Sequence, residues 1–577
     1  KDPILPVWEN GAVKHYYVDP LLFKSLSSMD TYRMNVPMEW IFGTTASFKR
    51  AGTTGLRASF GLMTNPIKDP QTMYTNSQAN ANGAELFAAW SASLGESIAS
   101  KTVGARTPWM DAFIRLGGEM ATSLGQDQDP TARAAKGLFK PETYAGRAVH
   151  TIDPRNGWKT FMAAYDKYRD VVQAPESAPR LAEMKLVARD IGWEPGQSMS
   201  MDQSIQLLTA LKEVTTDFTA AGEFGRVWNR MVPFFNAGIQ GPRANLRAFK
   251  RNKTKFLLRG LQLAVPTLMN WWLIKDEDWY KEMNARTKFL NWHIPVTLPW
   301  GEKTLFRIPR AFEVGVVFAA LPEALAEGFY RQEPEIAKEW FGHFFQILAP
   351  LGAPPLASEA YAWGSNKDSF WNTNIVPKGE LKSPKEDQFG PYTSELSKTL
   401  GRIFNKSPRK LDHAIKGIGG PVTMDVVKLL GIGPKGVEKE GEAADMWLVG
   451  RLFQRGGRMG NHPKTVDMLY DKFEEAELKQ NSSRHSETVG EVKKRLVLMD
   501  AVKAVSALAF VRKMSGNLKH REQLTQSMIN ISKEATESGP VSKAKRKYVK
   551  SFMKIAKKKK DLVKARLEDE ARKNQEK

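Results

Sequence analysis

Residues Met231 to Lys255 read MVPFFNAGIQGPRANLRAFKRNKTK, and they run directly into FLLRGLQLAVPTLMNWWLI from Phe256 to Ile274. The first stretch is strongly basic and predicts a helix with one cationic face. The second is apolar and rich in tryptophan, but it is neither a clean core helix nor a clean membrane span. This pairing is expected where nucleic acid meets a bilayer or a partner protein.

The basic stretch predicts a helix over Asn236 to Lys250, with a break at Gly241-Pro242. Arg247 follows Arg243 by four residues, and Lys250 and Arg251 follow Arg247 by three and four. These spacings place Arg243, Arg247, Lys250 and Arg251 in one stripe. Such a stripe can follow a phosphate backbone, so we predict contact with nucleic acid or anionic lipid. The alternative is a solvated surface face whose acidic partners come from elsewhere in the fold. The charge alone does not decide between them.

The apolar stretch has 19 residues, close to the roughly 20 that a membrane-spanning helix needs. It is interrupted by polar residues and a proline, namely Arg259, Gln262, Pro266 and Asn270. We therefore expect buried core rather than a permanent membrane span. Contact with a membrane or another copy of the chain is the alternative, and it would involve Trp271, Trp272 and Trp279, because tryptophan prefers the boundary between lipid and water.

The composition sets the outer limits. The chain has 577 residues, of which 42% are hydrophobic, enough for a sizeable core in two or three domains. It carries 85 Lys and Arg against 63 Asp and Glu, a net charge of +22, which favours polyanionic partners. It has no cysteine, so disulfides and thiolate metal sites are excluded. A start at Lys1 without a secretory signal indicates a piece of a longer polypeptide.

The C-terminal segment holds almost half of the net charge. Its last 37 residues contain 15 Lys and Arg against 5 Asp and Glu, giving +10. They predict a basic amphipathic helix outside the core, with Tyr548, Phe552, Ile555, Leu562 and Val563 along one side. DNA, an anionic membrane and a partner helix all fit this profile, and we favour a polyanion contact. Its predicted contact residues are Lys550, Lys554, Lys557, Lys558 and Lys560.

The hydrophobic pattern predicts a mainly α fold: a multi-helix core with one or two small β-hairpins, a long extended Gly/Pro-rich arm and a separate helical C-terminal region. The domains expected are a helical core over 1–363, an arm or linker over 364–441 and the helical region 442–577. The hairpins are expected near 8–18, around the turn Asn10-Gly11, and near 288–308, around Gly301. The predicted core positions of an earlier helix are Ile205, Leu208, Leu211, Val214 and Phe218.

No catalytic motif is found in the sequence. The phosphate-binding and hydrolytic patterns GxGxxG after a strand, GxxxxGK[ST], HExxH and GxSxG are all missing, and no two of the eight histidines are spaced as a local metal site. The Gly-rich pieces at 417–420 and 431–436 are expected to be loops or helix C-caps. We therefore predict no enzyme active site, no cofactor and no metal in this chain, although an enzymatic domain could lie elsewhere in a longer parent.

Four stretches together resemble a known family. They are LRASFGLMTNPIKDPQTMYTNS from Leu56, VPFFNAGIQGPRANLRAFK from Val232, FRIPRAFEVGVVFAALPEAL from Phe306 and TSELSKTLGRIFNKSPRKLDHAIKGIGG from Thr393. In this order they are similar to the large polyvalent protein-associated domain, thirty-eighth of its series, of very long bacteriophage proteins. The resemblance covers roughly Trp8 to Gly436, and the residues after Gly441 match nothing known to us. The family brings no established catalytic residues.

The resemblance implies a virion-packaged protein that enters the host with the genome. Its expected place is the virion interior before infection, and the host periplasm and inner membrane, or the cytoplasm, after ejection. The leading hypothesis is an oligomeric DNA-ejection conduit, whose partners are double-stranded DNA, other copies of the chain, other phage ejection proteins and an anionic host inner membrane. The alternative is a DNA-binding passenger module of a giant injected protein, whose enzymatic region, such as a virion RNA polymerase, lies outside this chain.

Overall fold

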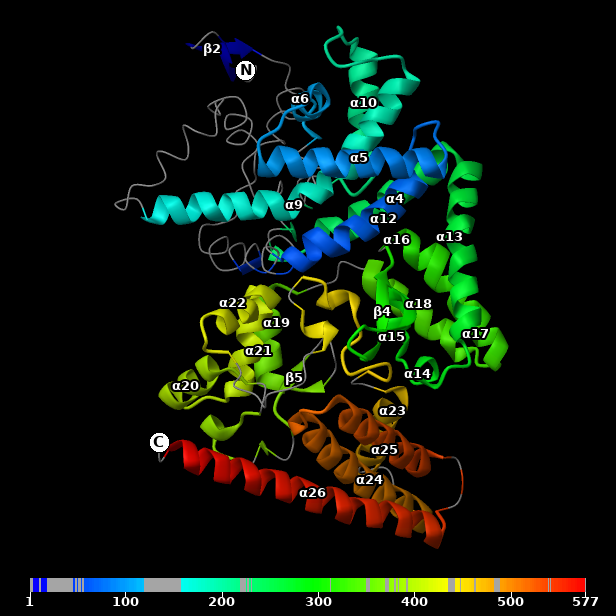
Figure 1. Ribbon diagram of the computed structural model, residues 1–577, viewed down its shortest axis with the longest axis vertical. Coiled ribbons are helices and arrows are strands. Elements are labelled where there is room, and N and C mark those ends of the chain that lie inside the picture. Colours follow the sequence, from blue (N-terminus) through cyan, green and yellow to red (C-terminus); the bar gives the residue numbers. More distant parts are fainter. Residues whose placement is uncertain are drawn as a thin grey trace.

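The computed structural model is mainly helical, as the sequence predicts. Its helices form several packed groups, and the long C-terminal helix lies along one side of the molecule (Figure 1). The structure describes residues 4–9, 12–17, 57–118, 157–217, 231–311, 313–348, 353–368, 373–377, 383–390, 393–433, 442–446, 448–460, 463–481, 488–537 and 541–575, with the single positions 45, 46, 49, 53, 220, 225, 228, 229, 380, 381 and 539.

The first group of elements follows a β-hairpin. Strands β1 (Ile4–Glu9) and β2 (Ala12–Tyr17) pair antiparallel with Glu9 opposite Ala12, which confirms the hairpin predicted there. The helices that follow are the π-helical turn η3 (Ser59–Thr64), α4 (Asn65–Asn76), α5 (Gly83–Thr102), α6 (Pro108–Arg115), α9 (Gly157–Asp190) and α10 (Met201–Glu213). Leu211 and Val214 are fully buried in their shared core, and Leu208 packs against it. The prediction for Ile205 is wrong, because its side chain is 51% exposed. Phe218 lies outside the described residues.

Local capping explains where these helices begin. Asn82 accepts a hydrogen bond from the amide of Glu85, whose side chain in turn accepts from the amide of Asn82, and Ser200 and Gln203 form the same reciprocal pair at α10. Such boxes satisfy two amides that a helix start leaves without partners.

The second group contains the quoted basic and apolar stretches. Its elements are α12 (Phe235–Arg251), α13 (Lys253–Ile274), α14 (Asp278–Lys281), α15 (Ala285–Leu290), β3 (Asn291–Thr297), β4 (Lys303–Pro309), α16 (Glu313–Gly315), the π-helical turn η7 (Val316–Ala320), α17 (Leu321–Arg331) and α18 (Glu335–Leu348). The hairpin β3–β4 turns through Gly301 at φ +85°, as predicted. The expected break at Gly241-Pro242 is wrong, because α12 continues through Pro242 and packs Gln240, Ala244 and Ala248 inward.

The third group corrects the expected extended arm between 364 and 441. It contains α19 (Pro355–Ser365), β5 (Lys367–Asp368), β6 (Thr373–Asn374), the 3-10 turn η9 (Lys385–Asp387), α20 (Glu395–Phe404), α21 (Pro408–Gly419) and α22 (Pro421–Leu429). Proline and glycine mark helix ends here instead of preventing helices. Pro408 and Pro421 begin α21 and α22, and Gly420 ends α21 at φ +73°. Asp412 ties α20 to α21 by accepting hydrogen bonds from the hydroxyls of Ser394 and Ser397, both within 2.6 Å.

The fourth group has a hydrophobic core of its own. It consists of the 3-10 turns η10 (Ala443–Asp445) and η11 (Gly450–Leu452), then α23 (Lys464–Asn481), α24 (Val489–Met514), α25 (Leu518–Thr536) and α26 (Lys543–Gln575). The expectation that the last helix lies outside the core is wrong: Val549 and Ala556 of α26 are buried in the same cluster as Leu498, Val505 and Ile529.

The C-terminal group is fastened to the second group by polar contacts. The buried carboxylate of Glu282 accepts a hydrogen bond from the amide of Thr465 and lies 3.0 Å from Nζ of Lys533. The amide of Gln454 donates to the carbonyl of Leu305 on β4 at 2.9 Å, and the rings of Phe306 and Phe453 meet nearby. The hairpin β3–β4 is therefore a junction between the two groups.

Candidate functional site

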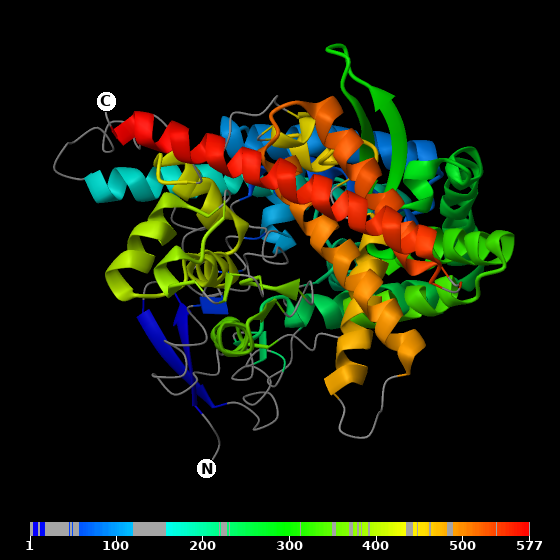
Figure 2. The ribbon, with the colours of Figure 1, turned by 90° about the horizontal axis from the view of Figure 1, so that it is seen from below.

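The described residues present three candidate sites: a lysine-rich face on α26, an apolar face on α13 and a pocket lined by charged residues beside α17. Figure 2 shows α26 crossing the width of the molecule on one of its faces. Among the described residues, no group of histidines, aspartates and glutamates could hold a metal ion. No described helix is both long and apolar enough to cross a membrane.

The lysine face of α26 comprises Lys550, Lys554, Lys557 and Lys558, all exposed and without an ion pair in the described part of the chain. Burial of Val549 and Ala556 on the other side fixes the orientation of the helix, so these lysines cannot rotate into the protein. Lys560 differs from them, because it is half-buried and its ammonium lies 5.6 Å from the ring centre of Phe510. Held at fixed spacing on a packed helix, the four lysines suit a polyanion.

An exposed apolar row flanks the lysine face. Tyr548, Ile555 and Leu562 follow one another at intervals of seven residues, and all three are exposed. The sequence predicts all five apolar residues along one side of a helix outside the core, but the structure divides them, because Phe552 and Val563 pack against the core. The free surface of α26 is therefore amphipathic, with cations beside an apolar row, as in helices that lie on anionic membranes.

The stripe predicted on α12 is divided. Arg247 Nε lies 2.7 Å from Glu213 Oε1, and Arg251 pairs with the other oxygen of the same carboxylate. Arg243 and Lys250 are exposed, with no ion pair in the described residues. Two of the four cations thus have the internal acidic partner that the alternative interpretation requires, and only Arg243 and Lys250 remain free for a polyanion.

One side of α13 packs into the core, and the other side, here called the bare face, is exposed and apolar. Phe256, Gly260, Thr267, Trp271 and Ile274 are buried, and Gly260 lies so close to Phe318 that an added Cβ would come within 2.4 Å of its ring. The opposite side is exposed along its length through Leu257, Leu258, Leu261, Val265, Leu268, Met269, Trp272 and Leu273. The helix stands at an edge of the molecule (Figure 1).

Polar contacts explain one interruption in the apolar stretch, Arg259. The guanidinium of Arg259 donates to the carbonyls of Tyr74, Ser77 and Ala81, so this arginine holds the loop after α4. Trp271 and Trp279 are buried, whereas Trp272 is 64% exposed. Of the three tryptophans predicted to contact a membrane or another copy, only Trp272 lies on the bare face.

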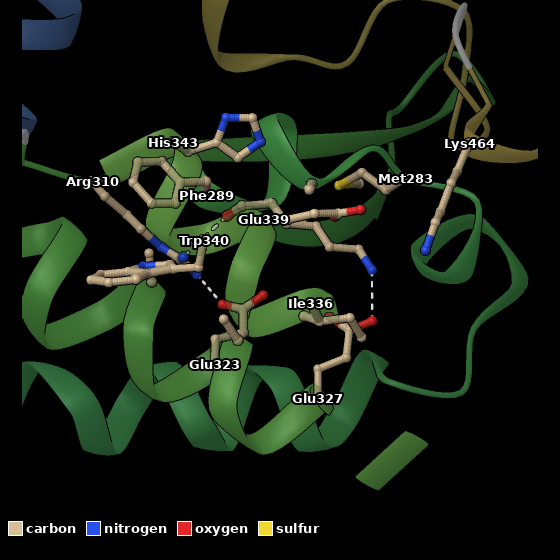
Figure 3. Close-up of a pocket in the computed structure, with 14 residues that line it drawn as sticks. Met283, Phe289, Arg310, Glu323, Glu327, Ile336, Glu339, Trp340, His343 and Lys464 are labelled. Atoms are coloured by element: carbon tan, nitrogen blue, oxygen red, sulfur yellow. Dashed lines mark hydrogen bonds and ion pairs between the residues drawn. The ribbon is translucent and has the colours of Figure 1, made fainter. Parts of the chain in front are cut away.

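The pocket lies beside α17 and is shown in Figure 3. Glu323 pairs with Arg310, and Glu327 lies 2.7 Å from Lys288 Nζ and 3.0 Å from Arg331 Nε. The hydroxyl of Tyr280 lies 2.6 Å from Glu323 and 3.0 Å from Glu327, bridging the two carboxylates. Glu339, His343 and Lys464 also line the pocket, together with apolar residues that include Phe289 and Trp340.

The electrostatics of this network indicate a structural role. Burial, and then the neighbouring carboxylates, raise the pKa of Tyr280 well above 10, so the phenol remains a hydrogen-bond donor. Burial alone would raise the pKa of Glu327, but Lys288 and Arg331 outweigh it and hold that pKa below its usual value. Each carboxylate is engaged by a cation and the shared hydroxyl, so neither is placed as a free base. Sequence reasoning missed this cluster because only the fold brings Arg310, just after β4, and the glutamates of α17 to Tyr280 and Lys288.

Residues 277–449 match the family model of the large polyvalent protein associated domain 38. This match covers the charged pocket except Lys464, together with the hairpin β3–β4 and helices α19 to α22. It is narrower than the resemblance drawn from the sequence, because the stretches from Leu56 and Val232 lie outside it. The chain matches no curated protein and no solved structure.

Proposed function

We propose that this chain, which contains a large polyvalent protein associated domain 38 over residues 277–449, is an internal virion protein of a bacteriophage that enters the host with the genome. Several copies assemble into part of a conduit that carries duplex DNA across the host periplasm and inner membrane. The observation that carries the proposal is the lysine face of α26, a row of unpaired cations fixed on a packed helix.

Assembly is assigned to the bare face of α13. The helix has 22 residues, so its apolar side is about 33 Å long. A stable interface buries about 800 Å² on each partner, more than one helix side supplies. Helix α17 contacts α13 and adds the exposed side chains of Leu325 and Phe329. An apolar surface of this extent on both helices supports contact between copies.

The apolar row on α26 supports an anionic membrane as a further partner. Its three side chains lie beside the lysine face, so one surface can offer charge to lipid headgroups and apolar groups to the bilayer boundary. Other ejection proteins of the same phage are proposed partners of the assembled conduit, in keeping with the family resemblance.

The second candidate is a passenger module that binds DNA as a monomer, ejected beside an enzyme located elsewhere in a longer parent protein. The α26 face favours it independently, because a single copy already presents four aligned lysines without any assembly. The two functions differ in one property: the conduit requires contact between copies.

The distinguishing experiment measures the mass of the chain in solution by sedimentation velocity, with and without duplex DNA. The test variant replaces Leu261 and Val265, which are 57% and 58% exposed, with glutamine. The matched control replaces Val103 and Met201, exposed apolar residues away from α13, in the same way. The conduit proposal expects a defined oligomer that the test variant loses and the control keeps. A wild-type chain that stays monomeric on DNA would favour the passenger module.

A further inference from the structure

Three arginines from distant parts of the sequence meet where the second and fourth groups of elements join. Arg57 lies just before η3, Arg307 is on β4 and Arg451 is in η11. Nη2 of Arg307 donates to the backbone carbonyl of Arg451 at 2.9 Å. The guanidinium of Arg451 lies 5.5 Å from the ring centre of Phe60, close in sequence to Arg57. The cluster is thus built by the fold.

No carboxylate in the described residues forms an ion pair with Arg57, Arg307 or Arg451. Neighbouring Arg455 is different, because it lies 2.7 Å from the carboxylate of Asp445. Within the cluster, Nε of Arg307 and Nη1 of Arg451 are buried and have no hydrogen-bond partner. Leaving a buried charged donor without a partner costs free energy, so these donors favour binding of an anion.

Burial and the crowding of like charges lower the pKa values of Arg307 and Arg451. Burial, and then the charge of Arg455, lower the pKa of Arg307 to about 10. Burial, and then the charges of Arg57 and Arg307, lower the pKa of Arg451 to about 10 as well, although the charge of Asp425 acts in the opposite direction. All three side chains keep partial exposure, so a small ion can reach them from solvent.

We propose that Arg57, Arg307 and Arg451 form a binding site for a phosphate group. Planar guanidinium groups match the oxygens of phosphate with paired N–H donors, which makes arginine the preferred residue for such sites. Because all three arginines are only partly exposed, the site favours a small solute, either inorganic phosphate or the terminal phosphate of a nucleotide, over the backbone of duplex DNA. The bound group joins the segment before η3, the hairpin β3–β4 and the start of the C-terminal region.

The proposal is tested by calorimetric titration of the whole chain with inorganic phosphate, and separately with a short DNA duplex, at constant ionic strength. Arg57→Gln is the main variant, because the side chain of Arg57 makes no hydrogen bond or ion pair in the described structure. The backbone carbonyl of Arg57, which accepts hydrogen bonds from the amides of Phe60 and Gly61, is kept in the variant, so the fold should stay intact. Losing one charged donor is expected to weaken phosphate binding by about tenfold or more. Arg307→Gln should do the same, and Arg402→Gln, an exposed arginine on α20, should bind as the wild type does.

Saturable phosphate binding that both cluster variants weaken and Arg402→Gln preserves would establish the site with a small solute as its ligand. If only the duplex gives a response that depends on Arg57, the phosphate chemistry stands and the DNA backbone is its source. Absence of any saturable response to phosphate or duplex at constant ionic strength would overturn the proposal. An affinity unchanged in Arg57→Gln and Arg307→Gln would overturn it equally.

Discussion

Replacing Lys554, Lys557 and Lys558 by glutamine is expected to remove most of the salt dependence of DNA binding. The four lysines of the α26 face span Lys550 to Lys558, a rise of about 12 Å along the helix. Each phosphate contact contributes roughly 0.9 to the slope of log affinity against log salt. Four contacts therefore give a slope of roughly −3.6, and the single lysine left in the variant gives about −0.9.

These slopes translate into a large difference in affinity. Between about 50 and 200 mM salt, the wild-type chain should lose ~150-fold in affinity for duplex DNA, and the variant only ~3.5-fold. Glutamine is almost as good a helix former as lysine, so α26 should stay helical and keep Val549 and Ala556 in the core. Fluorescence anisotropy of a labelled duplex at several salt concentrations measures both slopes.

A second triple variant provides the control for total charge. Lys493, Lys503 and Lys519 are exposed on α24 and α25, and their replacement by glutamine changes the net charge of the chain by the same amount. This control should keep a slope close to that of the wild type. If the two triple variants lose slope equally, the binding reflects net charge, and the assignment to α26 is refuted.

The remaining predictions concern the charged pocket, one histidine and the last helix. Glu323→Gln leaves the side chain of Arg310, which is 2% exposed, without its charge partner. Urea unfolding should show that the free energy of unfolding falls by about 3 kcal/mol. A fall below about 1 kcal/mol would contradict the buried network. A hydrogen bond to Glu359, opposed by burial and supported by the charges of Glu359 and Asp368, raises the pKa of His413 above 6.5. The stability that protonated His413 contributes is therefore full below pH 6.5 and is lost as pH rises through the higher folded-state pKa. His413→Gln should remove this pH-dependent fall from the profile of melting temperature against pH. An unchanged profile would exclude His413 as its source. Deleting residues 541–577 uncovers the core of the C-terminal group, and limited proteolysis should then cut α24 and α25 first; unchanged protection would show that α26 is dispensable.

The sequence predicts local structure well where a short-range signal exists. The turn at Gly301 specifies the hairpin β3–β4. The three-residue spacing of Leu211 and Val214 specifies which side is buried at the end of α10. The extended arm predicted over 364–441 is helical in the structure, and the difference has a physical reason. Pro408 and Gly420 stand at the two ends of α21, where they favour a helix, but a simple count of such residues treats them as breakers.

Tertiary pairings were beyond the reach of sequence reasoning. Glu213 lies more than thirty residues before Arg247, and no pattern indicates that one carboxylate holds two arginines of the predicted stripe. On α26, apolar residues occupy several sides of the helix, so periodicity alone does not fix which of them face inward. Contact with α24 and α25 decides it, burying Val549 and exposing Ile555. The arginine cluster was invisible because Arg57, Arg307 and Arg451 are joined only by the fold.

Electron microscopy of the purified chain with anionic liposomes and duplex DNA tests the proposed conduit most directly. The account predicts rings in the membrane, with a lumen wide enough to admit duplex DNA, that disappear when Leu261 and Val265 are replaced by glutamine. A chain that coats DNA as a monomer and ignores the liposomes would contradict the conduit and leave the passenger module in its place.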